Sequence, residues 1–140
     1  MVRIICLDIG SVRIGVAVSD PLGMFAQGIA VWKADSPWLD ELEKLLVRYN
    51  TSCLVVGLPL LESGKEGTSA LLARDAASKI NERFPQVTIK MWDERYTTSI
   101  ATSYLLEGNV SRKKRKKSVD KIAAAVILQS YMDAHGAETF

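Results

Sequence analysis

The chain has 140 residues, of which 48% are hydrophobic and 24% are charged. This composition excludes a disordered chain and is typical of one globular domain, expected here over residues 1–140. No apolar run approaches the roughly 18 residues of a membrane span, and no basic-then-apolar leader opens the sequence, so we expect a cytoplasmic protein with no membrane contact.

The formal net charge of +2 conceals an asymmetry. One run of six cations holds a third of the 18 Lys and Arg residues, so the rest of the chain carries 12 cations against 16 acids. Such a run is typical of a solvated, mobile loop, and a loop of this kind can also clamp phosphate groups. The run consists of Arg112, Lys113, Lys114, Arg115, Lys116 and Lys117.

Cysteine and histidine are too scarce for the common zinc sites. Cys6 and Cys53 both lie in apolar runs, and His135 is the one histidine of the chain. The two cysteines are therefore expected as reduced core residues. His135 precedes a glycine near the end of the last predicted helix, where a helix-terminal cation is the ordinary role, so it is a poor general base.

The first predicted strand covers residues 4–9. Its apolar run leads to Asp8 near the carboxyl end, and Gly10 follows the strand. A continuous run of this kind indicates a strand buried on both faces. A carboxylate at its end loses solvation unless a cation or a hydrogen-bond donor meets it, although a turn aspartate that caps nearby N–H groups is the simpler interpretation. Gly10 allows a positive φ or the close approach of a ligand.

Two further strands complete the first half of the predicted sheet. Residues 12–19 alternate large apolar residues with small or polar ones, which favours a hairpin partner for the first strand. Asp20, Pro21 and Gly23 match a type I turn, and residues 24–32 return as a third strand.

The second half of the chain alternates helices with strands. Ser36 and Pro37 predict a helix start. Strands are expected over residues 53–57 and 87–91, separated by a long helix whose apolar positions include Leu72, Ala76 and Ile80. A further helix is expected from Thr97 or Thr98 to about residue 109, and a last helix from a Ser118 cap to about His135. This order predicts an α/β fold, a mixed five-stranded sheet with helices on both faces, which binds ligands at the carboxyl ends of its parallel strands.

Three carboxylates are expected near that edge. Asp8 and Glu94 follow strand ends, and Asp120 lies at a helix start directly after the basic run. Neighbouring carboxylates repel one another unless a divalent cation neutralises them, and Mg²⁺ or Mn²⁺ with oxygen ligands can cleave phosphodiester bonds. The simpler alternatives are that Asp93 or Glu94 pairs with Arg95, and that Asp120 only complements the helix dipole.

At these residues the sequence resembles the YqgF/RuvX family, in an ordered set of motifs that spans nearly the whole chain. The family comprises Holliday-junction-resolvase-like nucleases of the ribonuclease H superfamily, associated with maturation of the 5′ end of pre-16S ribosomal RNA. The motifs are Asp8-Ile9-Gly10, Arg13-Ile14-Gly15-Val16-Ala17, Ser19-Asp20-Pro21, Val55-Val56-Gly57-Leu58-Pro59, Trp92-Asp93-Glu94-Arg95 with Thr97-Thr98, the basic run, and Val119-Asp120 before Ala123-Ala124.

The resemblance implies that Asp8, Glu94 and Asp120 form an acidic triad that binds the divalent metal, and that the basic run holds nucleic acid. It also implies a ribonuclease H-like fold. The sequence departs from the family where Leu61-Glu62-Ser63-Gly64 stands in place of an Asn-Met-Asp-Gly-like stretch. Asp93 would replace Glu94 as the ligand if the strand register differed by one residue, because successive side chains point to opposite faces.

Several functions stay open at this point. A metal-dependent nuclease would act on structured RNA such as pre-16S rRNA or on branched DNA, as a monomer or as a homodimer. A non-catalytic module that binds structured RNA is the alternative from another class. An ATPase of the actin and sugar-kinase type shares the Asp-x-Gly hairpin but needs two such domains, and 140 residues hold one.

Overall fold

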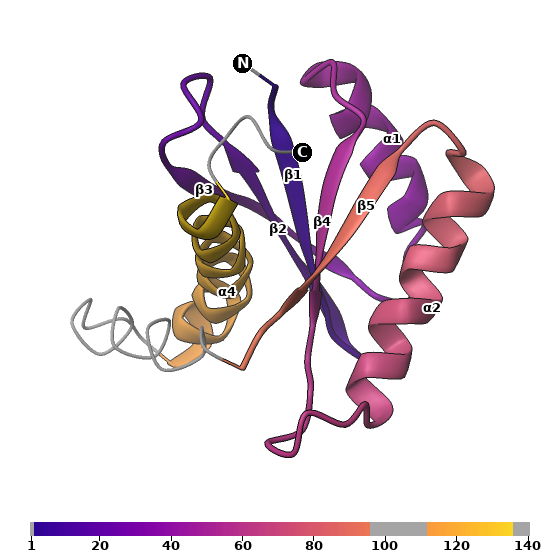
Figure 1. Cartoon of the computed structure of the whole chain (residues 1–140), viewed down its shortest axis with the longest axis vertical. Helices are drawn as coiled ribbons and strands as arrows, with labels where there is room; N and C mark the ends of the chain where they lie inside the picture. The colour runs from indigo at the N-terminus through magenta and orange to yellow at the C-terminus, as the bar shows by residue number, and fades with distance from the viewer. Residues whose placement is uncertain (1, 96–111, 136–140) are drawn as a thin grey trace.

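The computed structural model describes residues 2–95 and 112–135, with backbone alone from residue 112 to residue 120. Five strands form one sheet in the order β3-β2-β1-β4-β5 (Figure 1). Their bounds are β1 Ile4–Ile9, β2 Arg13–Ser19, β3 Ala26–Lys33, β4 Cys53–Leu58 and β5 Thr88–Asp93.

The sheet is mixed, as predicted. β1 pairs antiparallel with β2, β2 pairs antiparallel with β3, and β4 runs parallel to both β1 and β5. The carboxyl ends of β1, β4 and β5 therefore meet at one edge of the sheet. This edge is where a ligand is expected in such folds.

Helices cover the two faces of the sheet, and Figure 1 shows α4 on one side with α1 and α2 on the other. The helices are α1 Trp38–Arg48, α2 Thr68–Arg83 and α4 Arg112–His135. Because side chains alternate along a strand, β1 sends Ile5 and Leu7 into the core under α1 and α2, and Ile4 and Cys6 into the core under α4. Both faces of the central strand are thus buried, which explains its continuous apolar sequence.

The start of α1 and one position on the buried face of α2 differ from prediction. Ser36 does not cap α1, because its hydroxyl donates to the Lys33 carbonyl and the helix begins after Pro37. In α2 the small residues Ala70, Ala73 and Ala76 face the core with Ile80, whereas Leu72 is exposed. The predicted positions Ala76 and Ile80 are thus confirmed as core residues, and Leu72 is the one that is wrong.

The largest correction concerns the basic run. It was expected as a loop, and the structure places residues 112–117 in the first turns of α4, with Ser118 inside the helix rather than at its cap. Lys and Arg are good helix formers, and residues 112–135 contain neither Gly nor Pro, so nothing in the sequence stops the helix before the run. The helix predicted over residues 97–109 lies outside the described residues.

Close packing of α4 on the edge strand β3 depends on a glycine. A Cβ atom at Gly28 would lie 2.8 Å from the carbonyl oxygen of Lys121 in α4. Side chains larger than hydrogen are thereby excluded where the two elements cross.

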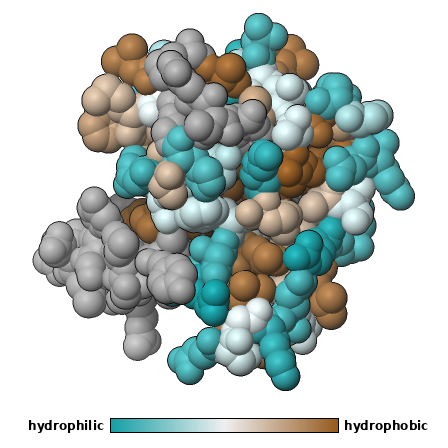
Figure 2. All heavy atoms as spheres, in the orientation of Figure 1, coloured by the Kyte–Doolittle hydropathy of each residue, from teal (hydrophilic) through white to brown (hydrophobic). Residues whose placement is uncertain are grey.

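Several large apolar side chains are exposed in the described residues, and three of them lie in one turn. Leu22, Met24 and Phe25 are exposed in the turn between β2 and β3, and Figure 2 shows brown atoms at the upper left, over this hairpin. Within the described parts of the chain, no helix has both the length and the hydropathy that crossing a membrane requires.

Candidate functional site

Two carboxyl groups meet at the edge formed by the carboxyl ends of β1, β4 and β5. Asp8 follows Ile4 and Cys6 on the α4 face of β1, so strand alternation directs it to that side. Glu94 comes directly after β5, and its backbone N–H donates to the Leu58 carbonyl at 3.1 Å, which fixes it to the end of β4. The Glu94 carboxyl group is hydrogen-bonded to that of Asp8.

This contact keeps a proton on the pair. Burial raises the pKa of Glu94 to about 9, and the hydrogen bond to Asp8 and the charges of Asp8 and Asp93 act in the same direction. Two ionised carboxylates this close would repel each other, so one of them stays protonated when no cation is bound. A divalent cation could replace the shared proton, and the hard oxygen donors fit Mg²⁺ or Mn²⁺.

The space for Glu94 depends on Gly57, a residue that sequence reasoning did not single out as part of the site. A Cβ atom at Gly57 would lie 2.6 Å from Glu94 Oε1, 2.9 Å from Glu94 Cδ and 2.9 Å from Cδ1 of Ile127. The glycine thus leaves room for the carboxyl group between β4 and α4. The sequence feature that could have identified Gly57 is its place at the end of the apolar run that forms β4.

Cys6 lies under the carboxyl pair. Its side chain is fully buried, and burial, followed by the charges of Asp8 and Glu94, raises the pKa of the thiol well above its ordinary value. The thiol is therefore protonated and a poor metal ligand. The prediction of a reduced core cysteine is confirmed for Cys6, whereas Cys53 is half-buried at the edge of the same core.

The choice between Asp93 and Glu94 that the sequence left open has a geometric answer. Asp93 is the last residue of β5, paired with Leu58, and it binds Arg95 rather than Asp8. Arg95 Nε and Nη2 lie 2.8 and 2.7 Å from Asp93 Oδ2, and the Arg95 hydrogen bond lowers the pKa of Asp93. Glu94, on the other side of the strand, is the residue placed beside Asp8.

The third predicted carboxylate and the basic run are placed only by their backbone. Asp120 lies in α4 one turn before Ala124, which is buried against the sheet. Helical spacing puts position 120 in line with Ala124, Ile127 and Leu128 on the sheet-facing stripe. Among the side chains that the structure describes, to which that of Asp120 does not belong, no group of three metal-ligating residues occurs.

Two other predicted residues have structural roles. Gly10 has no positive φ, and its N–H donates to the Arg13 carbonyl, whose oxygen would lie 2.6 Å from a Cβ at this position. The group that comes close to Gly10 is therefore the Arg13 carbonyl of the chain's own hairpin. His135 stacks on Tyr131 with ring centroids 4.4 Å apart and meets Trp92 edge-on.

Comparisons with known proteins identify a family model and close relatives in sequence. The family model described as "RuvX: Holliday junction resolvase" matches residues 2–134. A Clostridium botulinum (strain Hall) protein named "Putative pre-16S rRNA nuclease" is 45% identical over 134 residues, covering 94% of this chain and 97% of that protein. A protein of the same name from Lactococcus lactis subsp. cremoris (strain MG1363) is 44% identical over 137 residues, covering 95% of each.

Solved structures show the same fold at low identity. RuvC of T. thermophilus, in complex with a Holliday junction substrate, matches with a TM-score of 0.59 and 14% identity over 100% of both chains. The fowlpox virus resolvase, in complex with Holliday junction DNA, matches with a TM-score of 0.57 and 17% identity over 94% of this chain and 97% of that chain. The ribonuclease H-like α/β fold predicted from the sequence is confirmed.

Proposed function

This chain belongs to the RuvX family, and on that basis we propose that it is a nuclease that hydrolyses phosphodiester bonds with the help of Mg²⁺ or Mn²⁺. The observation that carries the proposal is the hydrogen-bonded pair of Asp8 and Glu94 at the carboxyl end of the parallel strands. A buried pair that shares a proton is costly to keep in a fold unless a cation uses it.

Asp8 and Glu94 would hold the metal, and Asp120 would complete the site from the first half of α4. Support for Asp120 comes from its place on the sheet-facing stripe of that helix. A divalent metal bound there supplies an activated water and neutralises the leaving oxygen of the phosphodiester. Gly57 keeps the Glu94 carboxyl group in position.

The six cations at the start of α4 are proposed to bind the phosphates of the substrate. These residues, Arg112 to Lys117, precede Asp120 in the same helix. A helix that carries both groups ties substrate binding to the metal site through one rigid element. Phosphate contacts of this kind position a nucleic acid without reading its sequence.

We favour structured RNA, in particular the 5′ end of pre-16S rRNA, as the substrate. The relatives that are 44–45% identical over nearly their whole length carry a pre-16S rRNA nuclease name. Branched DNA is the second candidate, because the family itself is described as Holliday junction resolvase. The free cysteines Cys6 and Cys53 agree with action in a reducing compartment such as the cytoplasm.

The test is a cleavage assay of the wild type and of Asp8→Asn on a 5′-extended 16S precursor and on a four-way DNA junction. With Mn²⁺ or Mg²⁺, the wild type should cut the RNA, and the variant should cut it at least about 100-fold more slowly because one metal ligand has lost its charge. RNA affinity in chelator should be equal in the two proteins.

A readout independent of turnover accompanies this assay. Mn²⁺ should raise the melting temperature of the wild type, because a ligand that binds the folded state stabilises it, and the rise should be lost in Asp8→Asn. Equal cleavage by both proteins would remove Asp8 from the mechanism. Paired nicking of the junction in preference to the RNA would favour the resolvase, and binding without any cleavage would favour a non-catalytic RNA-binding module.

A further inference from the structure

A cavity lies on the face of the sheet opposite the carboxyl pair. It has a volume of about 260 Å³ and opens between α1 and the last residues of β3. β3 is an edge strand, and its pairing with β2 shifts register where Ile29 stands between Gly28 and Ala30. The bulged strand beside α1 leaves a hollow rather than a filled contact.

The lining of the cavity is largely apolar and aromatic. Ile29, Ala30 and Leu45 line it together with Trp32 of β3 and Tyr49 at the end of α1, both of which are half-buried. Arg3 holds Tyr49 in place, since its guanidinium carbon lies 4.7 Å from the centre of the ring. Two aromatic side chains from separate elements thus border one hollow of limited size.

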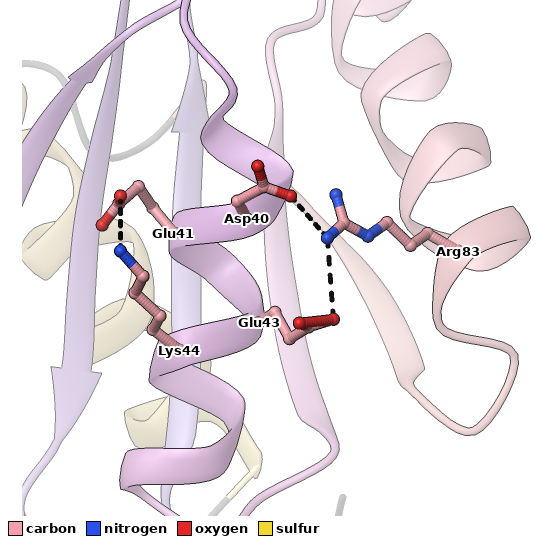
Figure 3. Close-up of polar contacts among 5 residues, drawn as sticks. All are labelled: Asp40, Glu41, Glu43, Lys44 and Arg83. Carbon is pink, nitrogen blue, oxygen red and sulfur yellow. Dashed lines mark hydrogen bonds and ion pairs between the residues drawn. The ribbon is translucent and has the colours of Figure 1, made fainter.

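Cations stand at the rim. Lys44 and Arg48 are exposed on α1, and Glu41 beside them forms an ion pair with Lys44 at 3.1 Å. Figure 3 shows that the other acids of α1, Asp40 and Glu43, point to the opposite side, where both contact Arg83 of α2. They do not neutralise the rim.

Arg48 is the cation that the rim leaves uncompensated. In the part of the chain that the structure describes, it forms no ion pair. Two cations and one anion therefore border the hollow, and its rim attracts an anion such as phosphate.

The cavity reaches the end of the sheet that holds the carboxyl pair only at Trp32, whereas Tyr49 lies beside Arg3, just before the amino end of β1. Trp32 pairs with Ile14, and Ile14 pairs with Ile9, the residue after Asp8. Two strand spacings, about 10 Å, separate Trp32 from β1 along the sheet. Arg13 and Lys33 are paired at that same end, so the path between the two sites also carries cations.

We propose that this cavity binds one unpaired nucleobase of the RNA substrate at a distance from the cleaved bond, stacked against Trp32 and Tyr49 with a neighbouring phosphate at Lys44 and Arg48. The inference rests on the proposed nuclease function. The volume of the cavity lies below the roughly 300 Å³ at which pockets for drug-sized ligands begin, and this smaller size suits a single base. Stacking tolerates any base, so the site holds the strand without reading its sequence.

The test measures binding of a single-stranded RNA octamer in EDTA, where no metal-dependent cleavage occurs. Stacking on an aromatic side chain is worth about 1–3 kcal/mol per base, so Trp32→Ala should weaken binding by about 5- to 150-fold. Trp32→Phe should keep most of the affinity but lose the tryptophan fluorescence quenching that the octamer causes in the wild type. A fully paired RNA duplex should cause no such quenching.

A charge variant tests the rim with a matched control. Arg48→Glu should weaken octamer binding several-fold, whereas Lys79→Glu, which changes an exposed cation of an i,i+4 pair on α2, should leave it unchanged. Equal weakening by both variants would mean a general charge effect and would overturn the site.

Folding of Trp32→Ala is checked by its thermal melt. A folded variant with wild-type affinity would overturn the inference. If the variant does not fold, Trp32→Phe decides: retained affinity without quenching supports the site, and unchanged quenching overturns it.

The outcome is separable from that of the proposed function. Cleavage that depends on Asp8, with octamer binding indifferent to Trp32, would remove the base site and leave the nuclease. Binding that depends on Trp32 without any cleavage would leave the base site and remove the nuclease.

Discussion

At the scale of single residues, Gly57 is the position on which the geometry of the carboxyl pair depends. It sits where β4 ends, and the atoms nearest to a Cβ there belong to Glu94 and Ile127. The Glu94 carboxyl group therefore occupies the space that the side chain of any other residue at position 57 would fill. A family motif contains this glycine, and its physical reason appears only when β4, β5 and α4 are assembled.

Gly57→Ala should consequently impair catalysis more than folding. The added methyl group must displace the Glu94 carboxyl group from Asp8, and we expect metal-dependent cleavage to fall by at least about tenfold, since a 1 Å misplacement at an active site can cost about 100-fold. The melting temperature should fall by only a few degrees. Cleavage kinetics and a thermal melt in chelator measure the two effects.

The matched control is Gly67→Ala, at the start of α2. A Cβ there would meet the exposed Leu61 side chain at 3.3 Å, which can move aside. This variant should cleave like the wild type. If Gly57→Ala cleaves as fast as Gly67→Ala, the carboxyl pair tolerates the displacement and its assignment as the metal site loses its main support.

At the scale of elements, α4 combines roles that the sequence distributed between a loop and a helix. The six cations form its first turns, and the residues from Ala124 to Met132 pack on the sheet. Phosphate contacts made from a helix would be fixed relative to the proposed metal site, whereas those made from a mobile loop would not be. The close contact between Lys121 and Gly28 anchors this helix on β3.

Neutralising the lysines of the run should therefore weaken RNA binding similarly for different sequences. Replacing Lys113, Lys114, Lys116 and Lys117 by Gln, a residue that keeps the helix, should flatten the dependence of log affinity on log salt. The slope should change by up to about 0.9 for each phosphate of a duplex that the variant no longer binds. Binding titrations at several salt concentrations measure the slope.

The control for this variant removes the same charge elsewhere. Four exposed cations away from both proposed sites serve the purpose, namely Lys65, Arg74, Lys79 and Lys90. Their replacement should change the slope less. An equal change in both proteins would show that net charge, and not the start of α4, governs binding.

At the scale of the whole molecule, the carboxyl pair links folding stability to pH. Because the pKa of Glu94 is raised from 4.5 to about 9, the folded protein binds a proton in this range that the unfolded chain has released. Stability then falls as pH rises between these values. The wild type in EDTA should thus lose stability from about pH 5 to about pH 9.

Urea denaturation at a series of pH values in EDTA tests this prediction. In Asp8→Asn the decline should be shallower, because the charge that raises the pKa of Glu94 is gone. Mn²⁺ should reduce the decline in the wild type, since the cation takes the place of the proton. As a control, Asp75→Asn removes an exposed acid of α2 and should reproduce the wild-type profile. A wild-type stability that rises with pH in EDTA would contradict the shared proton.

The sequence by itself determined the hairpin order of the first three strands, the mixed sheet and the edge at which the acidic residues gather. These follow from local patterns, since apolar runs, alternation and turn residues act within a few positions of the chain. The same patterns could not decide where α4 begins, because the basic run lacks both hydrophobic period and helix breakers.

The tertiary structure decided which residues meet. That Glu94 and not Asp93 joins Asp8 depends on the side of β5 that faces α4, and a shift of one residue would reverse it. The role of Gly57 and the cavity beside Trp32 each arise where elements distant in sequence come together. Their physical basis is packing between elements, which no pattern within a single element specifies.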